Sequence, residues 1–226
     1  MHEVAHVDGK ILRTAKALLV APGHLTREYW QGHVASWIRP IRVFLVAAAI
    51  HLFFATGIGP INFHVLVERA PNGDRHIMVS SGTNASLHRD GFVAEDAHEQ
   101  EALLETFAHA YNAVRYLSPL FFACACWVLY RRQQPYPVSH LILALHFYSF
   151  WYLLATVAGL LARWQPVLQF LVVGSSLYLA LSLRRIFAQA WWLTVAKTVV
   201  LTVLLMAIEG GLAYGAIMYA ERALGL

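Results

Sequence analysis

Charged residues are scarce in this chain. Asp, Glu, Lys and Arg make up 13% of the 226 residues, whereas hydrophobic residues make up 58%. An ordinary soluble domain is roughly 25% charged and about 45–50% apolar. A water-soluble fold of this length could not hide so much apolar surface, because folding still leaves a large area exposed. The composition therefore excludes an ordinary soluble domain and indicates one compact membrane domain.

Cysteine is equally rare. The chain has two, Cys124 and Cys126, and residues two positions apart on a helix point to roughly opposite faces. They cannot form a disulfide with each other or share a metal ion, so no metal site is expected. A nucleophile elbow, a phosphate-binding glycine loop, an HExxH sequence and a paired-carboxylate motif are all missing. Motifs thus give no support to hydrolase or kinase activity, which favours, without deciding, a protein that is not an enzyme.

A secretory signal is also missing from residues 1–40, because the apolar stretch Leu18–Ala21 is too short for one. We expect the first spanning helix to serve as an uncleaved insertion signal. The formal net charge of +4 comes from cations that apolar runs separate, rather than from one basic face. No nucleic-acid partner is therefore expected.

The long apolar stretches predict an all-α membrane protein with about five transmembrane helices. The predicted spans cover residues 41–58, 113–130, 138–161, 167–183 and 191–219. The first is short for the hydrocarbon core, and the last is long enough to tilt or to begin in the interface. Residues 41–226 are thus predicted to form the transmembrane domain, and residues 1–40 a cytoplasmic or interfacial segment.

Residues 8–21 have the pattern of an amphipathic helix that lies in the lipid headgroup layer. Apolar residues fall on one side, and Lys10, Arg13 and Lys16 recur on another. Such a helix places its cations near anionic lipids. The pair Pro22-Gly23 ends it, and a second short helix is expected over residues 25–34.

Residues 59–112 form a polar, acidic insertion between the first two spans. Within it, INFHVLVERA and RHIMVSSG flank the sequence Pro71-Asn72-Gly73-Asp74, which predicts a small β-hairpin at residues 61–81. A lone hairpin is marginally stable in water, so we expect it to dock on the membrane domain or on a protein partner.

The positive-inside rule predicts the orientation of the chain. With the N-terminus in the cytoplasm, that side receives Arg39 and Arg42, then Arg131-Arg132, then Arg184-Arg185. The opposite side receives the acidic insertion and few cations. Short cytoplasmic loops are enriched in Lys and Arg. We therefore predict a multi-pass protein of the inner membrane, with a cytoplasmic N-terminus and an extracytoplasmic C-terminus and hairpin.

Three segments carry a resemblance to a known family. APGHLTREYWQGH spans residues 21–33, RPIRVF follows at residues 39–44, and HLILALHFYSFWYLL spans residues 140–154. On these segments, chiefly Ile11–Phe54, the chain resembles the bacterial membrane family called domain of unknown function 3667. The resemblance implies a membrane architecture and no particular reaction. Many members begin with a cysteine-rich, zinc-ribbon-like segment that this chain lacks, so no role tied to that segment is implied.

Ionisable side chains inside a bilayer are costly and are functional candidates by default. The predicted spans contain His51, His140, His146, Lys197 and Glu209. His51 and His146 both lie roughly 12–15 Å from the cytoplasmic face if depth is counted along each helix from its start. At matched depth, the two imidazoles could ligate one haem or pass a proton. Alternatively, each could bond a neighbouring helix.

Glu209 is followed by Gly210, Gly211 and Gly215. The spacing of Gly211 and Gly215 lets another helix approach closely, which makes this face a candidate partner surface. The Glu209 carboxylate could pair with Arg115, form a proton or substrate site, or point outward. Lys197 lies near a helix end and can reach the headgroups.

The segment at residues 26–40 combines cations with aromatic residues at the predicted cytoplasmic interface. It could bind lipid headgroups or a partner, or it could be an ordinary interfacial anchor. The candidate interface residues are Arg27, Tyr29, Trp30, His33, Trp37 and Arg39.

Three functional hypotheses follow. The leading one is a non-enzymatic scaffold, assembly factor or accessory subunit that acts through membrane lipids or a protein partner. The second is a transporter of a small solute or proton that uses Glu209 and His146. The third is a redox protein with a b-type haem between His51 and His146. The leading hypothesis requires no cofactor.

Overall fold

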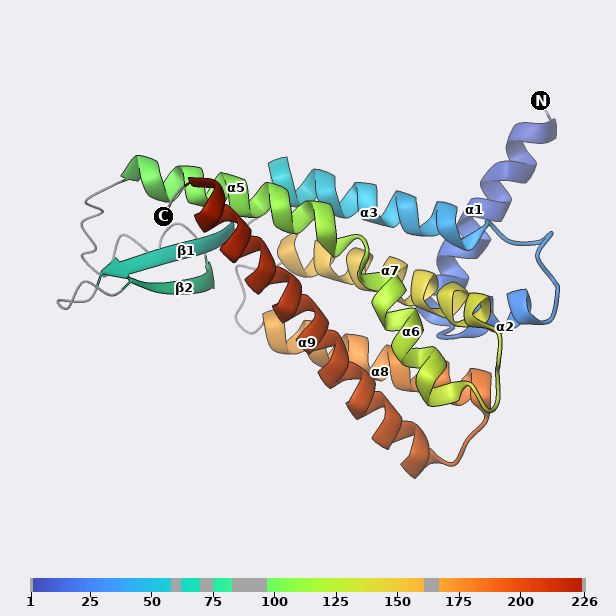
Figure 1. The fold of residues 1–226 in the computed structure, drawn as a ribbon. Helices are drawn as coiled ribbons and strands as arrows, with labels where there is room; N and C mark the ends of the chain where they lie inside the picture. The colour runs from blue at the N-terminus through green and yellow to red at the C-terminus, as the bar shows by residue number, and fades with distance from the viewer. Residues whose placement is uncertain (1, 58–61, 70–74, 83–96, 161–166, 225–226) are drawn as a thin grey trace.

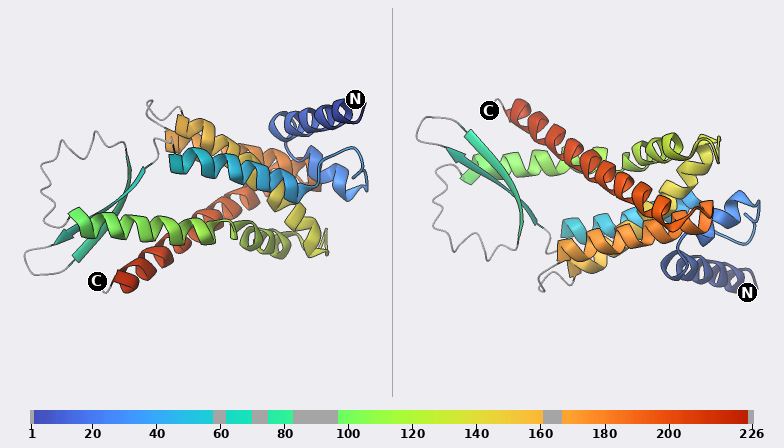
Figure 2. Two further views of the ribbon diagram at one scale, coloured as in Figure 1. Left: turned by 90° about the horizontal axis from the view of Figure 1, so that it is seen from above. Right: turned by 90° about the horizontal axis from the view of Figure 1, so that it is seen from below.

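The computed structural model describes residues 2–57, 62–69, 75–82, 97–160 and 167–224. The chain is predominantly helical, and its N-terminal helices lie at the opposite end of the molecule from the C-terminus (Figures 1 and 2). The elements are α1 (His2–Val20), α2 (His24–Trp30), α3 (Pro40–Gly57), β1 (Asn62–Arg69), β2 (Arg75–Gly82), α5 (Ala97–Arg115), α6 (Ser118–Tyr130), α7 (Pro137–Leu160), α8 (Val167–Phe187) and α9 (Trp191–Leu224).

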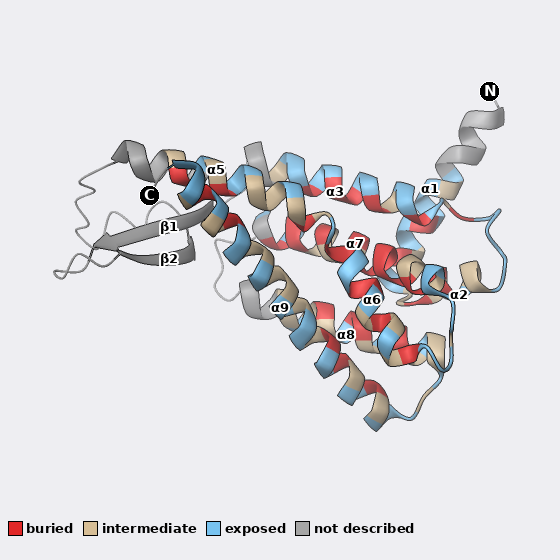
Figure 3. Cartoon of the chain, in the orientation of Figure 1, coloured by how far each residue is buried: buried red, intermediate tan, exposed pale blue. Residues whose placement is uncertain are grey.

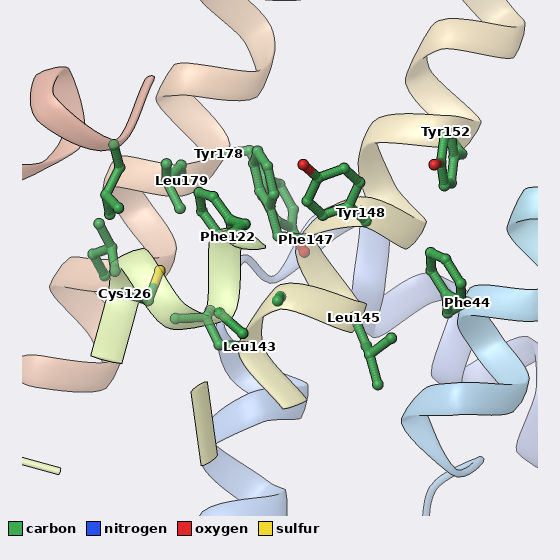
Figure 4. Close-up of a cluster of buried hydrophobic side chains, with 14 of the residues drawn as sticks. Phe44, Phe122, Cys126, Leu143, Leu145, Phe147, Tyr148, Tyr152, Tyr178 and Leu179 are labelled. Carbon is green, nitrogen blue, oxygen red and sulfur yellow. The ribbon is translucent and has the colours of Figure 1, made fainter. Parts of the chain in front are cut away.

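Helix α7 is the centre of the fold, since it contacts α2, α3, α6 and α8. A helix that is apolar on all sides is suited to such a buried position. On α7, Phe147, Tyr148 and Tyr152 are almost fully buried, and they form an aromatic core with Phe44 of α3 and Phe122 of α6 (Figure 4). Phe122 stacks on Phe147 with ring centroids 5.0 Å apart.

The predicted count of five spans is not supported by the described helices. Over the described residues, α7 and α9 are long and apolar enough to cross a bilayer, and the pair α5–α6 makes a third if it forms one bent span. The described apolar part of α3, Pro40–Phe54, is shorter, because 15 residues rise about 22 Å whereas the hydrocarbon core is about 30 Å thick. Helix α8 also does not qualify over its described part. Two or three helices thus have the length and composition of membrane spans.

The second predicted span, at residues 113–130, contains a break that the sequence analysis missed. Helix α5 ends at Arg115, α6 begins at Ser118, and their axes differ by 42°. Pro119 lies in the first turn of α6, where its missing N–H costs nothing. The same proline could not continue α5 through this point, so it was the available signal for the break.

Strands β1 and β2 pair antiparallel, with Asn62 opposite Gly82 and Arg69 opposite Arg75. They occupy the segment for which the sequence predicts a hairpin, and β1 contacts α5. The predicted Asn-Gly turn falls on residues 70–74, outside the described residues. The strand pair lies at the end of the molecule remote from α1 and α2 (Figure 2).

Exposed residues follow the outer faces of α3 and α9 (Figure 3). On α3 they include Leu45, Val46 and Phe53, while Phe44, Ala47 and Ala48 of the same helix are buried. Helix α9 packs against α5, α6 and α8 along one side only. These helices therefore present large apolar side chains away from the bundle.

Candidate polar site between α3, α5, α7 and α9

Glu209 of α9 is held by two tyrosines from different helices. Its carboxylate accepts a hydrogen bond from the hydroxyl of Tyr111 on α5 at 3.2 Å, and a longer one from Tyr148 on α7 at 3.4 Å. From the sequence, this side chain was expected to pair with Arg115, to form a proton or substrate site, or to point outward, and these tyrosines were not among its expected partners. A carboxylate between two phenol donors is oriented in the bundle and does not simply point outward.

Arg115, the last residue of α5, is 7% exposed. Its guanidinium carbon lies 5.2, 5.7 and 5.6 Å from the ring centroids of Tyr111, Trp151 and Tyr152. Three aromatic faces around one guanidinium make a cation–π cage. Arg115 lies near the middle of the paired helices α5–α6. If this pair crosses a bilayer, the arginine side chain is far from the headgroups, and burying its charge costs free energy.

Arg115 and Glu209 do not form the direct ion pair that the sequence analysis offered as one possibility. Both residues are described, and the ion pairs among the described residues do not include them. Tyr111 lies between the two, with its ring beside Arg115 and its hydroxyl bonded to Glu209. The reason is local, since Tyr111 and Arg115 are four residues apart and share one helix face.

His51 of α3 lies in the same region. It is 7% exposed, its ring stacks on Tyr152 with centroids 5.1 Å apart, and its Nδ1 lies 3.3 Å from Oγ1 of Thr156. The single hydroxyl proton of Thr156 is donated to the Tyr152 carbonyl at 2.8 Å. Nδ1–H of His51 must therefore be the donor to Thr156, which leaves Nε2 as an acceptor.

His146 belongs to a different site. It is 3% exposed, and its Nδ1 is hydrogen-bonded to Oγ1 of Thr26 on α2 at 2.9 Å. Thr156, the partner of His51, is ten residues farther along α7, which corresponds to about 15 Å. The two imidazoles thus have different hydrogen-bond partners, at different levels of α7.

The predicted depth match between His51 and His146 is therefore wrong. It assumed that α3 and α7 begin at the same level. In the structure, Phe44 near the start of α3 packs against Tyr152 in the second half of α7, with ring centroids 5.9 Å apart. Helix α3 therefore begins beside the second half of α7 and not at the level where α7 begins.

The interface residues divide into two groups. The aromatic members turn inward: the Tyr29 hydroxyl donates to the Ile38 carbonyl at 2.7 Å, and Nε1 of Trp30 donates to the Ser139 carbonyl at 3.1 Å. Burial raises the pKa of the Tyr29 hydroxyl, and the charge of Arg39 opposes this shift. Trp37 is buried and packs beneath the guanidinium of Arg13, with 5.4 Å between the Arg13 carbon and the ring centroid.

The polar members of the same group face outward. Arg27, His33 and Arg39 are all exposed, and Nδ1 of His33 lies 3.3 Å from a carboxylate oxygen of Glu28. The aromatic residues thus attach this segment to the bundle, while the cations remain available at its surface.

Three backbone contacts attach α1 and α2 to the helix bundle. Tyr178 of α8 donates to the Leu18 carbonyl at 2.8 Å, and Arg185 donates to the Pro22 carbonyl at 3.0 Å. Gly23, with a φ of +73°, approaches so closely that a Cβ would lie 2.8 Å from the Ser182 carbonyl oxygen. Glycine is needed here both for its backbone conformation and for the close approach.

The remaining polar candidates are spread through the bundle. His140 is fully buried, and its Nε2 lies 2.9 Å from the Gln134 carbonyl. Lys197, near the start of α9, donates to Gln189 at 3.2 Å and lies 4.0 Å from the Tyr130 ring centroid. No group of three or more potential metal ligands occurs among the described residues.

The two cysteines and the glycines of α9 also have different surroundings. Cys126 is buried and Cys124 exposed, as expected for neighbours on opposite helix faces. A Cβ added at Gly211 or Gly215 would meet nothing within 4 Å. No other described helix of this chain therefore packs on the glycine face of α9.

Sequence reasoning missed Thr26, Tyr111 and Tyr148 as partners of the candidate residues. Thr and Tyr are common residue types, and none of these three belongs to a recognisable motif. One signal was available for Tyr111, because its position four residues before Arg115 places both on one helix face. For Thr26 and His146, which are 120 positions apart, no local pattern links the pair.

Comparison with known proteins gives a match to a family model over the N-terminal part of the chain. No curated protein and no solved structure matches the chain. The matching family is described as "Protein of unknown function (DUF3667)", and its model covers most of α1, all of α2 and most of α3. The resemblance inferred from the sequence is thereby confirmed: residues 8–52 of this chain match the family DUF3667.

Proposed function

We propose that the chain is a multi-pass protein of a bacterial inner membrane that acts as a scaffold, assembly factor or accessory subunit through anionic lipids. The observation that carries this proposal is the concentration of cations at one end of the bundle, called here the cationic end. Its exposed members are Arg13, Lys16, Arg27, Arg39, Arg42, Arg131, Arg132 and Arg185.

The cationic end joins segments that are far apart in the sequence. Trp30 of α2 contacts Phe187 at the end of α8, with ring centroids 5.5 Å apart. Phe187 also stacks on Tyr130 at the end of α6, at 3.9 Å. At this end Glu28 lies on α2 and Glu3 and Asp8 lie on α1, so cations outnumber carboxylates here, whereas Glu105 and Glu221 lie on the distant parts of α5 and α9.

This charge separation supports a cytoplasmic position for the cationic end. Anionic lipids of the cytoplasmic leaflet attract basic segments with about 1 kcal/mol per Lys or Arg. Trp191 and Trp192 are exposed at the start of α9, where an aromatic belt favours the membrane interface. The N-terminus would then lie in the cytoplasm, and the hairpin and C-terminus outside it.

Helices α3 and α8 would contribute the remaining two spans of a five-span arrangement. Leu45, Val46 and Phe53 of α3 are exposed, as are Val173 and Leu177 of α8. Apolar side chains of this size are favourable in lipid and unfavourable in water. Each helix is also packed against α7, a helix that is long and apolar enough to cross a bilayer.

The lipid proposal is tested by native mass spectrometry of the solubilised full chain with phosphatidylglycerol. A variant with Arg27, Arg39, Arg131 and Arg132 changed to Gln should retain fewer phosphatidylglycerol molecules than the wild type. The matched control is Arg222→Gln, which removes an exposed cation at the opposite end of α9. Equal retention by wild type and the fourfold variant would refute the proposal.

A protein partner would use the hairpin or the glycine face of α9. Deleting residues 62–82 and changing Gly211 and Gly215 to Leu should each be compared with the wild type by copurification. A partner lost in one variant assigns the surface. If every copurifying protein is kept in both variants, neither surface has this role.

Transport of a proton or small solute past Glu209 and His146 is the second candidate function. It is favoured by the carboxylate held inside the bundle by Tyr111 and Tyr148. Liposome flux should fall in Glu209→Gln and in His146→Ala if these residues are on the path. Flux that persists in both variants would remove them from the mechanism.

A further inference from the structure

The break between α5 and α6 contains two buried hydrogen-bonding groups without a partner. Nε of Arg115 and the hydroxyl of Tyr116 are both buried, and neither has a hydrogen-bond partner among the described residues. Buried polar groups in proteins are nearly always paired. Two unpaired groups from consecutive residues therefore indicate that something outside the described residues bonds to them.

Both groups lie against the same side chain. The guanidinium carbon of Arg115 is 5.6 Å from the Tyr152 ring centroid, and the ring of Tyr116 is also 5.6 Å from it. Trp151 forms a further wall, 5.7 Å from the same guanidinium carbon. The result is a cation at an aromatic surface, with a phenol hydroxyl nearby.

The charges around Arg115 leave this cation without a direct counterion. Glu209 accepts from Tyr111 and Tyr148 and makes no ion pair with Arg115. His51 donates through Nδ1 to Thr156. Among the described neighbours, therefore, no anionic group contacts the guanidinium.

We infer that Arg115 and Tyr116 bind one oxyanion group, a carboxylate or a phosphate, at the break between α5 and α6. A guanidinium donates two parallel hydrogen bonds to such a group. The Tyr116 hydroxyl supplies a third donor. The first turn of α6 begins three residues after Arg115, and the positive end of its dipole also favours an anion.

The same oxyanion chemistry could come from a lipid headgroup or from a soluble anion. The test uses the full-length protein in detergent and measures binding of phosphatidylglycerol, of a long-chain fatty acid and of inorganic phosphate by native mass spectrometry. Tyr116→Phe removes one donor and keeps the ring, while Arg115→Gln removes the cation. The control is Arg222→Gln.

We expect Tyr116→Phe to weaken binding of one molecule per chain about tenfold, as for the loss of one charge-assisted hydrogen bond. Arg115→Gln should abolish that binding, and Arg222→Gln should leave it unchanged. Binding of phosphatidylglycerol or the fatty acid assigns a lipid ligand, and binding of phosphate alone assigns a soluble one. The melting temperature of each variant is measured together with its binding. If Arg115→Gln unfolds, Tyr116→Phe still reports on the site.

Two results would overturn the inference: wild-type protein that binds none of the three probes, or binding that is identical in wild type and Tyr116→Phe. Lipids held at the cationic end do not obscure the result. Their number should respond to the fourfold arginine variant and not to Tyr116→Phe, so the two proposals fail separately.

Discussion

Thr26 on α2 and His146 on α7 are joined by a hydrogen bond of 2.9 Å, although they lie 120 positions apart in the sequence. Tyr29, one turn after Thr26, places its ring 5.7 Å from the same imidazole. His146 thus anchors the N-terminal helices on the centre of the bundle. This contact also joins residues 8–52, which match the family model, to the central helix α7.

Thr26→Val should destabilise the protein by about 1–3 kcal/mol, because Nδ1 of His146 would lose its buried partner. The loss should also make α1 and α2 more accessible to protease. Thermal unfolding and limited proteolysis in detergent measure both effects. Thr26→Ser keeps the hydroxyl and should stay close to the wild type, whereas a Val variant as stable as the Ser variant would show that the bond contributes little.

Gly23→Ala should destabilise the attachment of α2 to α8. The new Cβ would lie 2.8 Å from the Ser182 carbonyl oxygen, at a residue with a φ of +73°. The matched control is Gly32→Ala, where φ is +85° and nothing lies within 4 Å. Both changes strain the backbone, by an amount of order 1–3 kcal/mol, but only the first adds a collision. Chemical unfolding should therefore show a larger loss at position 23, and equal losses would contradict the close approach.

Phe122→Ala should cost about 3–5 kcal/mol, as for truncation of a fully buried aromatic residue. Phe122 is 0% exposed and stacks on Phe147. Its neighbour Phe121 is 50% exposed, so Phe121→Ala should cost much less. Melting temperatures of the two variants in one detergent measure the difference. A reversed order would mean that α6 is rotated about its axis relative to this structure.

Tyr111 and Glu209 should be energetically coupled by about 0.5–1.5 kcal/mol, the usual contribution of one hydrogen bond. A double-mutant cycle with Tyr111→Phe and Glu209→Leu, which removes the acceptor, measures this coupling from the unfolding free energies of four proteins. Phe keeps the ring next to Arg115, so the cycle isolates the hydroxyl. Strictly additive effects would mean that the 3.2 Å contact adds no stability.

Much of the architecture was accessible from composition and periodicity. The apolar runs at residues 138–161 and 191–219 correspond to α7 and α9, because hydropathy is a property of the local sequence. The amphipathic pattern of residues 8–21 likewise falls within α1. Alternating residues around the Asn-Gly pair fall on β1 and β2, since period-two patterns are also local.

Other features depended on how helices are placed against each other. The break after Arg115 changed one predicted span into two helices, and the shift of α3 along α7 separated His51 from His146. The possible pairing of Arg115 with Glu209 became an indirect link through Tyr111. Counting from helix starts could not reveal these arrangements, because each depends on the register between packed helices.

The sequence by itself determined that this chain suits a membrane. Its scarce charge and long apolar runs favour lipid over water, whichever residues pack against one another. It also identified the few ionisable residues within the apolar segments. Only the tertiary structure decided which of them meet. His51 and Arg115 both lie against Tyr152, whereas His146 lies against Thr26. Side-chain partners are set by the packing of distant segments, and such packing leaves no local trace in the sequence.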